Sequence, residues 1–330
     1  MGKKMLCVLM VLFLLPTSAL SDKSRNLVKG EKQTPTSTSG LWRQPDNIAN
    51  RNLFYGPGGQ AGQPRPPFRF IEEDRDGSNP KFVVEDAQGI RWKVKLGDEA
   101  KPETVATRLL WAVGYFTDTN YHLQQMRVAR LPKLSRGQKY VSPDGTIYGA
   151  RLERTAKKID DWSWFDNPFV GTREFNGLRV MMALLNKWDL KQVNNAVYKM
   201  GDGELRYVVS DLGDTFGKTG SDWTRSKGNL DDYVDSRFVD EVTPRTVDLV
   251  MHSRPPLLYA VAVPYYLGRT RMSKVAEDIP RAHARWLGQW LARLSDKQIK
   301  DAFRAAHYTP PEVDIFSAKV RERIRQLNRL

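Results

Sequence analysis

The sequence predicts an α+β fold in which a small strand-rich half precedes a larger helical half. Short apolar runs bounded by turn residues concentrate between Phe68 and Thr155, whereas apolar residues at helical spacing dominate after Thr172. The 330 residues are 40% hydrophobic and include nine Trp, enough for a sizeable core in one large domain or two medium ones. Strands and helices in separate parts of a chain favour α+β, or two lobes with a cleft between them.

The first residues predict an export signal. Lys3 and Lys4 precede an apolar run, Met5–Leu15, which is too short to span a bilayer comfortably. Small residues follow this run, so residues 1–21 predict a signal peptide that is cleaved after Ser21. The expected location is therefore periplasmic or extracellular, and an uncleaved membrane anchor is the alternative.

The chain after this signal is polar at first and basic overall. Residues 22–67 are rich in Lys, Gln, Ser, Thr, Gly and Pro, and they predict a flexible segment, part of which can wrap the following domain. The one cysteine, Cys7, lies in the signal, so no disulfide-linked partner is expected. The net charge of +14 favours anionic partners such as a nucleotide, a phospholipid surface or nucleic acid, and an ordinary basic surface is the alternative.

Residues 68–158 are predicted to form the strand-rich half. Ala87–Gly89 joins two of its strands tightly, as in a hairpin. Val105 and Leu109 have helical spacing, and Pro102 suits the first turn of that helix. The predicted elements are the strands Phe68–Glu73, Lys81–Asp86 and Ile90–Leu96, the helix Pro102–Tyr115, and the strands Gln124–Arg130 and Thr146–Thr155.

Residues 159–330 predict the helical half, which two short strands interrupt. Gly201-Asp202-Gly203 is the turn between these strands. The predicted elements are the helix Thr172–Leu185, the strands Ala196–Met200 and Glu204–Ser210, and the helices Pro244–His252, Pro256–Leu267, Ile279–Leu294, Asp296–Ala306 and Pro311–Leu327.

Two sites in the strand-rich half are suited to phosphate groups. The loop that contains Gly77, Ser78 and Asn79 can lend backbone N–H groups to phosphates, together with Lys81 just after it. An ordinary polar hairpin turn is the alternative for this loop.

The second of these sites is the strand that contains Lys93 and Lys95 on one face. A strand lysine in a cleft can hold nucleotide phosphates when a carboxylate from a neighbouring helix orients it. Glu103, at the start of the next helix, is in the right place, and Glu99 is a less favoured substitute. An exposed basic edge strand is the alternative reading of this segment.

The loop after the helix Thr172–Leu185 carries the residues best suited to phosphoryl transfer. Asp189 can accept or steer the proton of an acceptor hydroxyl, and Lys191 can offset charge on the moving phosphoryl group. Asn194 and Asp211, which ends the second short strand, can ligate a metal ion. A few hard oxygen ligands suit Mg²⁺, which keeps waters and substrate phosphates as its other ligands. A capped turn is the alternative, because Asp and Asn are common in loops.

These residues resemble known sequence motifs. The segment Asp189–Asn194 resembles the Asp-Leu-Lys-Pro-Glu-Asn catalytic loop of Ser/Thr protein kinases, and Asp211-Leu212-Gly213 resembles their Asp-Phe-Gly. The upstream arrangement, with Pro80-Lys81, a strand lysine and a helix glutamate, is more similar to HipA-type and phosphatidylinositol-kinase-like atypical kinases. In those families a short loop with a Pro-Lys end replaces the glycine-rich loop.

This resemblance implies a bilobal kinase-like fold that binds ATP and Mg²⁺ between its lobes. Residues 68–158 would form the N-lobe and residues 159–330 the C-lobe. The resemblance makes Lys95 the phosphate lysine, Glu103 its partner and Asp189 the catalytic acid, with Asn194 and Asp211 as metal ligands. The chain departs from ordinary protein kinases in having Lys187-Trp188 in place of His-Arg, one glycine in the phosphate loop, and no Ala-Pro-Glu after Asp211.

The expected function is therefore that of an exported, atypical kinase-like phosphotransferase. It would move the γ-phosphate of ATP to an unidentified hydroxyl on a protein, a lipid or a small molecule. One alternative is a kinase-fold pseudoenzyme that acts as a nucleotide-binding or protein-interaction module. The other is a basic nucleic-acid binder, which the lack of helix-turn-helix spacing and of aromatic ribonucleoprotein motifs disfavours.

Overall fold

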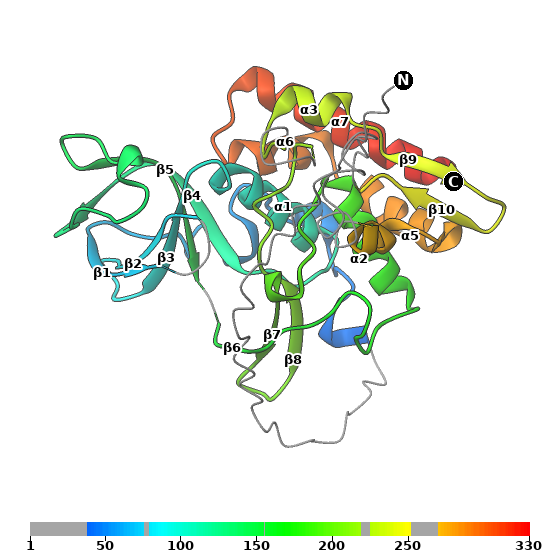
Figure 1. Cartoon of the computed structure of the whole chain (residues 1–330), viewed down its shortest axis with the longest axis horizontal. Coiled ribbons are helices and arrows are strands. Elements are labelled where there is room, and N and C mark those ends of the chain that lie inside the picture. Colours follow the sequence, from blue (N-terminus) through cyan, green and yellow to red (C-terminus); the bar gives the residue numbers. More distant parts are fainter. Residues whose placement is uncertain (1–37, 76–78, 155, 219–224, 252–269) are drawn as a thin grey trace, which may run out of the picture. The chain divides into compact units, whose positions relative to one another are not determined.

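The computed structural model describes residues 38–75, 79–154, 156–218, 225–251 and 270–330. The predicted signal peptide and the predicted helix Pro256–Leu267 lie outside these ranges, as do the candidate phosphate-loop residues Gly77 and Ser78. The described residues form a mixed α+β structure (Figure 1). No helix among them is both long and apolar enough to cross a membrane.

The strand-rich half closes into a five-stranded barrel with the order β1-β2-β3-β5-β4. Neighbouring strands are antiparallel except for β1 and β4, which pair in parallel through Phe68 and Val128 and so close the barrel. The predicted strands are confirmed, although β4 begins at Thr119 rather than Gln124. The strands are β1 (Phe68–Asp74), β2 (Lys81–Glu85), β3 (Arg91–Leu96), β4 (Thr119–Ala129) and β5 (Thr146–Arg154).

The alternation of side chains in β3 places an apolar face inside the barrel and a basic face outside it. Trp92 and Val94 are fully buried and pack with Phe82 of β2 in the barrel core. Lys95 therefore points out of the barrel, yet it is only 7% exposed. It is covered because α1 (Ala100–Ala112) follows directly and contacts β4 and β5 (Figure 1).

Part of the predicted flexible segment packs against the helices. Leu41, Trp42, Ile48 and Leu53 are buried in the same core as α1. The Trp42 indole N–H donates to the Val113 carbonyl over 2.6 Å, and its ring centroid lies 5.2 Å from that of Trp286. The described residues of this segment therefore wrap the domain.

The remaining elements surround a second core. The sheet β6-β7-β8 contains the predicted hairpin, and the helices α2, α5, α6 and α7 agree with the predicted ones to within two residues at each end. The elements are β6 (Lys158–Asp160), α2 (Arg173–Leu184), β7 (Asn195–Lys199), β8 (Leu205–Val209), α3 (Leu230–Asp235), α5 (Arg281–Ala292), α6 (Asp296–Arg304) and α7 (Pro310–Arg329).

The predicted helix Pro244–His252 is wrong. The described part of this segment is β10 (Thr246–Leu249), which pairs with β9 (Val239–Val242) and β11 (Ile279–Pro280). Val247 and Leu249 are buried, whereas Thr246 and Asp248 are half-buried, and this alternation is the two-residue period of a strand. Pro244 lies in the β9–β10 turn, where the Thr243 hydroxyl accepts from the Thr246 amide over 2.9 Å.

Replacement of Trp42 by Ala tests the packing of the N-terminal segment. Loss of a buried indole from a core lowers the free energy of unfolding by about 3–5 kcal/mol. Urea unfolding measures this change, with Ile315→Ala as the control because Ile315 is 44% exposed on α7. Equal, small effects of both substitutions would contradict the packing described here.

Candidate active site

A buried ion-pair cluster forms around the ammonium group of Lys95. Its Nζ lies 2.8 Å from Glu103 Oε2 of α1, 3.2 Å from Glu99 Oε2 and 3.3 Å from Asp211 Oδ1. The lysine comes from β3, the glutamates from the start of α1, and Asp211 from the segment after β8. The structure thus brings together three residues that the sequence predicts for one site: Lys95, Glu103 and Asp211.

The charges in this cluster support one another. Burial alone would lower the pKa of Lys95, but Glu103, Asp211 and Glu99 outweigh it and hold that pKa above its usual range. Burial would likewise raise the pKa of Asp211, but Lys95 and Lys187 hold that pKa well below its usual range. Lys95 and Asp211 are therefore both charged at neutral pH.

Glu103 is held by a second cation that the sequence does not predict. Arg151 of β5 places Nη2 2.8 Å from Glu103 Oε1, and its Nη1 pairs with the Glu153 carboxylate. Burial raises the pKa of Glu103 to about 7, while Arg151 and Lys95 act against that rise. The Leu212 amide also donates to Glu103 Oε1 over 3.4 Å, which ties α1 to the Asp-Leu-Gly turn.

Glu99 links further segments to the same lysine. One of its oxygens accepts from Asn79 Nδ2 over 2.6 Å, and the other pairs with the Lys227 ammonium. A side chain at Gly213 would place its Cβ 2.5 Å from that of Glu99, so only glycine allows this close approach. Glu99 therefore contacts the phosphate-loop candidate Asn79, the Asp-Leu-Gly turn and the segment after it.

The predicted catalytic loop is held together by its own hydrogen bonds. Lys191 Nζ lies 3.0 Å from Asp189 Oδ2, and Asn194 Nδ2 donates to the Asp189 carbonyl over 3.0 Å. The Asp189 side chain is 23% exposed, so its carboxylate is within reach of a bound molecule. Asp189, Lys191 and Asn194 thus lie together in one short loop.

A fully buried lysine supports this loop from beneath. Lys187 pairs with Asp214 and donates to the Asp189 carbonyl over 2.6 Å. Asp214 also accepts from the Trp188 amide over 3.1 Å and from the Asp189 amide over 2.5 Å. Lys187 stands where protein kinases have His-Arg, but nothing in the sequence shows that Asp214 is its partner.

The two predicted metal ligands, Asn194 and Asp211, are joined by a backbone hydrogen bond. The Asn194 carbonyl accepts from the Asp211 amide over 3.2 Å, so the two residues lie on adjacent strand ends. Within the described part of the chain, Asn194 Oδ1 accepts no hydrogen bond. Carboxylate and amide oxygens suit Mg²⁺. Oxygens of Glu99, Glu103 and Asp211 also lie within 4.8 Å of one another, but the Lys95 ammonium already bonds all three.

Lys81 does not join the cluster in this structure. Its ammonium lies 3.6 Å from Asp74 Oδ2, which it shares with Lys93 at 3.3 Å. Lys81 is nevertheless the direct cross-strand neighbour of Lys95 in the β2–β3 pair. Of the predicted phosphate-loop residues that the structure describes, Asn79 alone is in contact with the cluster.

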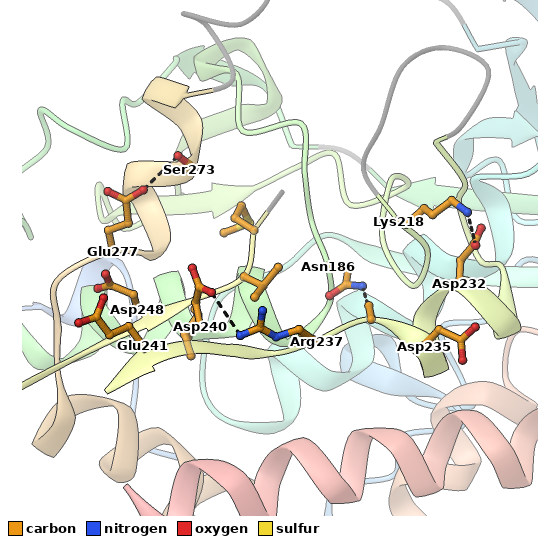
Figure 2. Close-up of a pocket in the computed structure, with 14 residues that line it drawn as sticks. Asn186, Lys218, Asp232, Asp235, Arg237, Asp240, Glu241, Asp248, Ser273 and Glu277 are labelled. Atoms are coloured by element: carbon orange, nitrogen blue, oxygen red, sulfur yellow. Dashed lines mark hydrogen bonds and ion pairs between the residues drawn. The ribbon is translucent and has the colours of Figure 1, made fainter. Parts of the chain in front are cut away.

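A cavity of about 770 Å³ lies elsewhere, among α3, β9 and β10. Figure 2 shows its acidic lining, in which Lys218 pairs with Asp232 over 2.6 Å and Arg237 with Asp240 over 3.4 Å. None of the described residues that the sequence predicts for the site lines this cavity.

Known proteins were compared with the chain. No family model and no curated protein matches it. Among the solved structures, the chain is similar to the crystal structure of the Helicobacter pylori proinflammatory kinase CtkA, with a TM-score of 0.46 and 10% sequence identity, and the match covers 79% of this chain and 96% of that one.

Replacement of Lys187 by Met tests the support of the loop. Asp214 would be left as a buried, unpaired carboxylate, which lowers the free energy of unfolding by about 3–5 kcal/mol. Urea unfolding measures the change. The matched control is Lys191→Met, where the lysine is 59% exposed, and the expected loss is below about 1 kcal/mol. Similar losses in the two variants would contradict a supporting role specific to Lys187.

Proposed function

We propose that the protein is a kinase-like phosphotransferase that moves the γ-phosphate of ATP to a hydroxyl acceptor. The observation that carries this proposal is the contact of Lys95 with both Glu103 and Asp211, at 2.8 and 3.3 Å. A lysine ordered by a helix glutamate and placed next to a metal-binding aspartate is the arrangement that protein kinases use to transfer phosphate from ATP. The barrel would be the N-lobe, the helical part would be the C-lobe, and the nucleotide would lie between them.

Each residue of the site has a role in this proposal. Lys95 would hold nucleotide phosphates, with Glu103 and Arg151 keeping it in place. Asn194 and Asp211 would hold Mg²⁺, which when bound neutralises charge on the phosphates. Asp189 would orient the acceptor hydroxyl and take its proton, and Lys191 would offset charge on the transferred group.

The three carboxylates around Lys95 set a condition for nucleotide binding. Phosphate oxygens can reach Lys95 only if one carboxylate gives up its place on the ammonium. Glu99 is the best candidate, because Lys227 and Asn79 already bond its oxygens and can stabilise it in a displaced position. Glu103 is less suited, since Arg151 and the Leu212 amide both fix it.

The same feature favours a second candidate function. A lysine that three carboxylates already satisfy is stable without a nucleotide, as expected of a kinase-fold pseudoenzyme that serves as a binding module. The predicted export signal agrees with this candidate, because ATP is scarce outside the cytoplasm. In the first function a protein, a lipid or a small molecule would accept the phosphate. In the second function no phosphate is transferred, and such a molecule would only bind.

Replacement of each of the two aspartates by Asn tests the proposed reaction. Asp189→Asn removes the proton acceptor and is expected to lower phosphoryl transfer at least about 100-fold while the protein still binds ATP and Mg²⁺. Asp211→Asn removes a metal ligand and is expected to abolish both transfer and Mg²⁺-dependent binding. Transfer of labelled phosphate and calorimetric titration with an ATP analogue measure the two effects.

Asp202→Asn is the control for both substitutions, because Asp202 lies in the exposed β7–β8 turn. It is expected to leave transfer and binding unchanged. Nucleotide binding without any transfer by the unmodified protein would support the pseudoenzyme. A protein that binds no nucleotide and transfers no phosphate would contradict both candidates.

Replacement of Glu99 tests the displacement proposed for this residue. Glu99→Gln removes one negative charge beside Lys95 and leaves the lysine more available to phosphate. The Kd for ATP with Mg²⁺ is expected to fall about fivefold, the equivalent of roughly 1 kcal/mol. Calorimetric titration measures it, with Glu322→Gln on α7 as a charge-matched control, because the Glu322 side chain is 43% exposed. Weaker binding by Glu99→Gln would show that Glu99 supports the nucleotide site instead of competing with it.

A further inference from the structure

A second cavity, of about 310 Å³, lies at the N-terminal end of α1. Segments from several parts of the chain line it, among them the start of α1 with Lys101, the β4–β5 pair with His122 and Gly149, the segment with Gly228, and Tyr308 just before α7. Asp189, Asn194 and Asp211 do not line it. The cavity therefore has a lining of its own, separate from those residues of the proposed active site.

Two buried polar side chains of this cavity have an unpaired atom. Tyr308 is 7% exposed and His122 is 5% exposed, and no described residue bonds the Tyr308 hydroxyl or His122 Nε2. The hydroxyl lies 2.9 Å from where a Cβ on Gly228 would be, and Nε2 lies 3.8 Å from one on Gly149. Both atoms thus point toward glycines of the lining. An unpaired buried polar group costs about 1–3 kcal/mol, so two of them here indicate a missing partner.

The charge of the cavity favours an anion as that partner. Lys101 Nζ lies 5.0 Å from the centre of the Tyr308 ring, and no carboxylate in the described ranges pairs with it. Lys101 is also in the first turn of α1, whose N-cap residue Glu99 makes no capping hydrogen bond. The amides of Ala100 and Glu103 in this turn already donate to the Gly97 and Glu99 carbonyls, and Pro102 has no N–H. The positive charge at this cavity therefore comes from the Lys101 ammonium, whereas the Glu99 and Glu103 carboxylates of the same turn bond Lys95 and do not line the cavity.

The acidic residues of the lining do not cancel this charge. The Glu312 carboxylate accepts hydrogen bonds from the amide and the hydroxyl of Thr309, at 2.7 and 2.8 Å, and Asp98 is exposed to water. His122 is neutral, because burial, His307 and Lys101 lower its pKa to about 3. His307 Nδ1 lies 2.9 Å from His122 Nδ1, and when His307 donates this hydrogen bond, Nε2 of His122 carries a proton that it can donate to an anion.

We propose that this cavity binds the phosphate group of a small molecule. Lys101 would supply the positive charge, and His122 and Tyr308 would donate hydrogen bonds. Donors from three separate elements suit a group with several oxygens better than a carboxylate with two. A volume of about 310 Å³ is at the lower limit for ligand pockets, so the molecule is inorganic phosphate or a small phosphate monoester.

Such a ligand would act on the proposed active site through Lys227. Lys227 lines this cavity and also pairs with Glu99, which in turn contacts Lys95. A phosphate near Lys227 would compete with Glu99 for its ammonium. The site itself does not depend on the proposed function, and its binding can be measured without ATP.

Calorimetric titration with inorganic phosphate, at constant ionic strength, tests the proposal. The unmodified protein is expected to bind saturably. Lys101→Met and Tyr308→Phe are each expected to raise the Kd about tenfold, or roughly 1.4 kcal/mol, whereas Lys101→Arg keeps most of the affinity. Lys297→Met is the charge-matched control and leaves the Kd unchanged, since Lys297 is 80% exposed on α6. Titration with phosphoserine against serine then separates a monoester from free phosphate.

Three outcomes would overturn the proposal. Phosphate that does not bind saturably excludes the site, and so does binding that Lys101→Met and Tyr308→Phe leave unchanged. An equal loss in Lys297→Met would show that the effect is one of overall charge. Near-ultraviolet circular dichroism checks that each variant is folded. Tyr308→Phe removes only one oxygen, so this variant keeps the test valid if Lys101→Met is unstable.

Discussion

The ammonium of Lys95, buried among the carboxylates of Glu99, Glu103 and Asp211, is the interaction on which the rest of the structure depends. Each carboxylate comes from a segment that the lysine must hold in place. Removing one partner of a buried ion pair leaves an uncompensated charge and costs about 3–5 kcal/mol. The cluster therefore joins the barrel, α1 and the segment after β8 at one point, and fixes the relative positions of the residues proposed to act on ATP.

The sequence indicates candidate residues for the site but not the residues that hold them in place. The spacing of Asp189, Asn194 and Asp211 places them at a loop and a strand end, where hydrogen bonds with local partners bring them together. Arg151 and Asp214 carry no such signal. They are ordinary strand and loop residues in the sequence, and only the packing of β5 against α1 and the burial of Lys187 show what they bind.

The same distinction between local pattern and tertiary context explains how well the fold is predicted. Alternation identifies the barrel strands, and helical spacing identifies α1, α2, α5, α6 and α7. The helix predicted from Pro244 is wrong because a short apolar run fits either a helix or a strand, and pairing with β9 and β11 makes this one a strand. Instead of joining the cluster, Lys81 pairs with Asp74, which lies directly opposite it in the β1–β2 pair.

The central claim is that Lys95, Asn194 and Asp211 form one nucleotide site. A crystal structure with a non-hydrolysable ATP analogue and Mg²⁺ tests it most directly. The account predicts phosphate oxygens on the Lys95 ammonium, Mg²⁺ on the side chains of Asn194 and Asp211, and Glu99 turned away from Lys95. An analogue bound elsewhere, or a cluster that stays closed around Lys95 with no phosphate in contact, would contradict it.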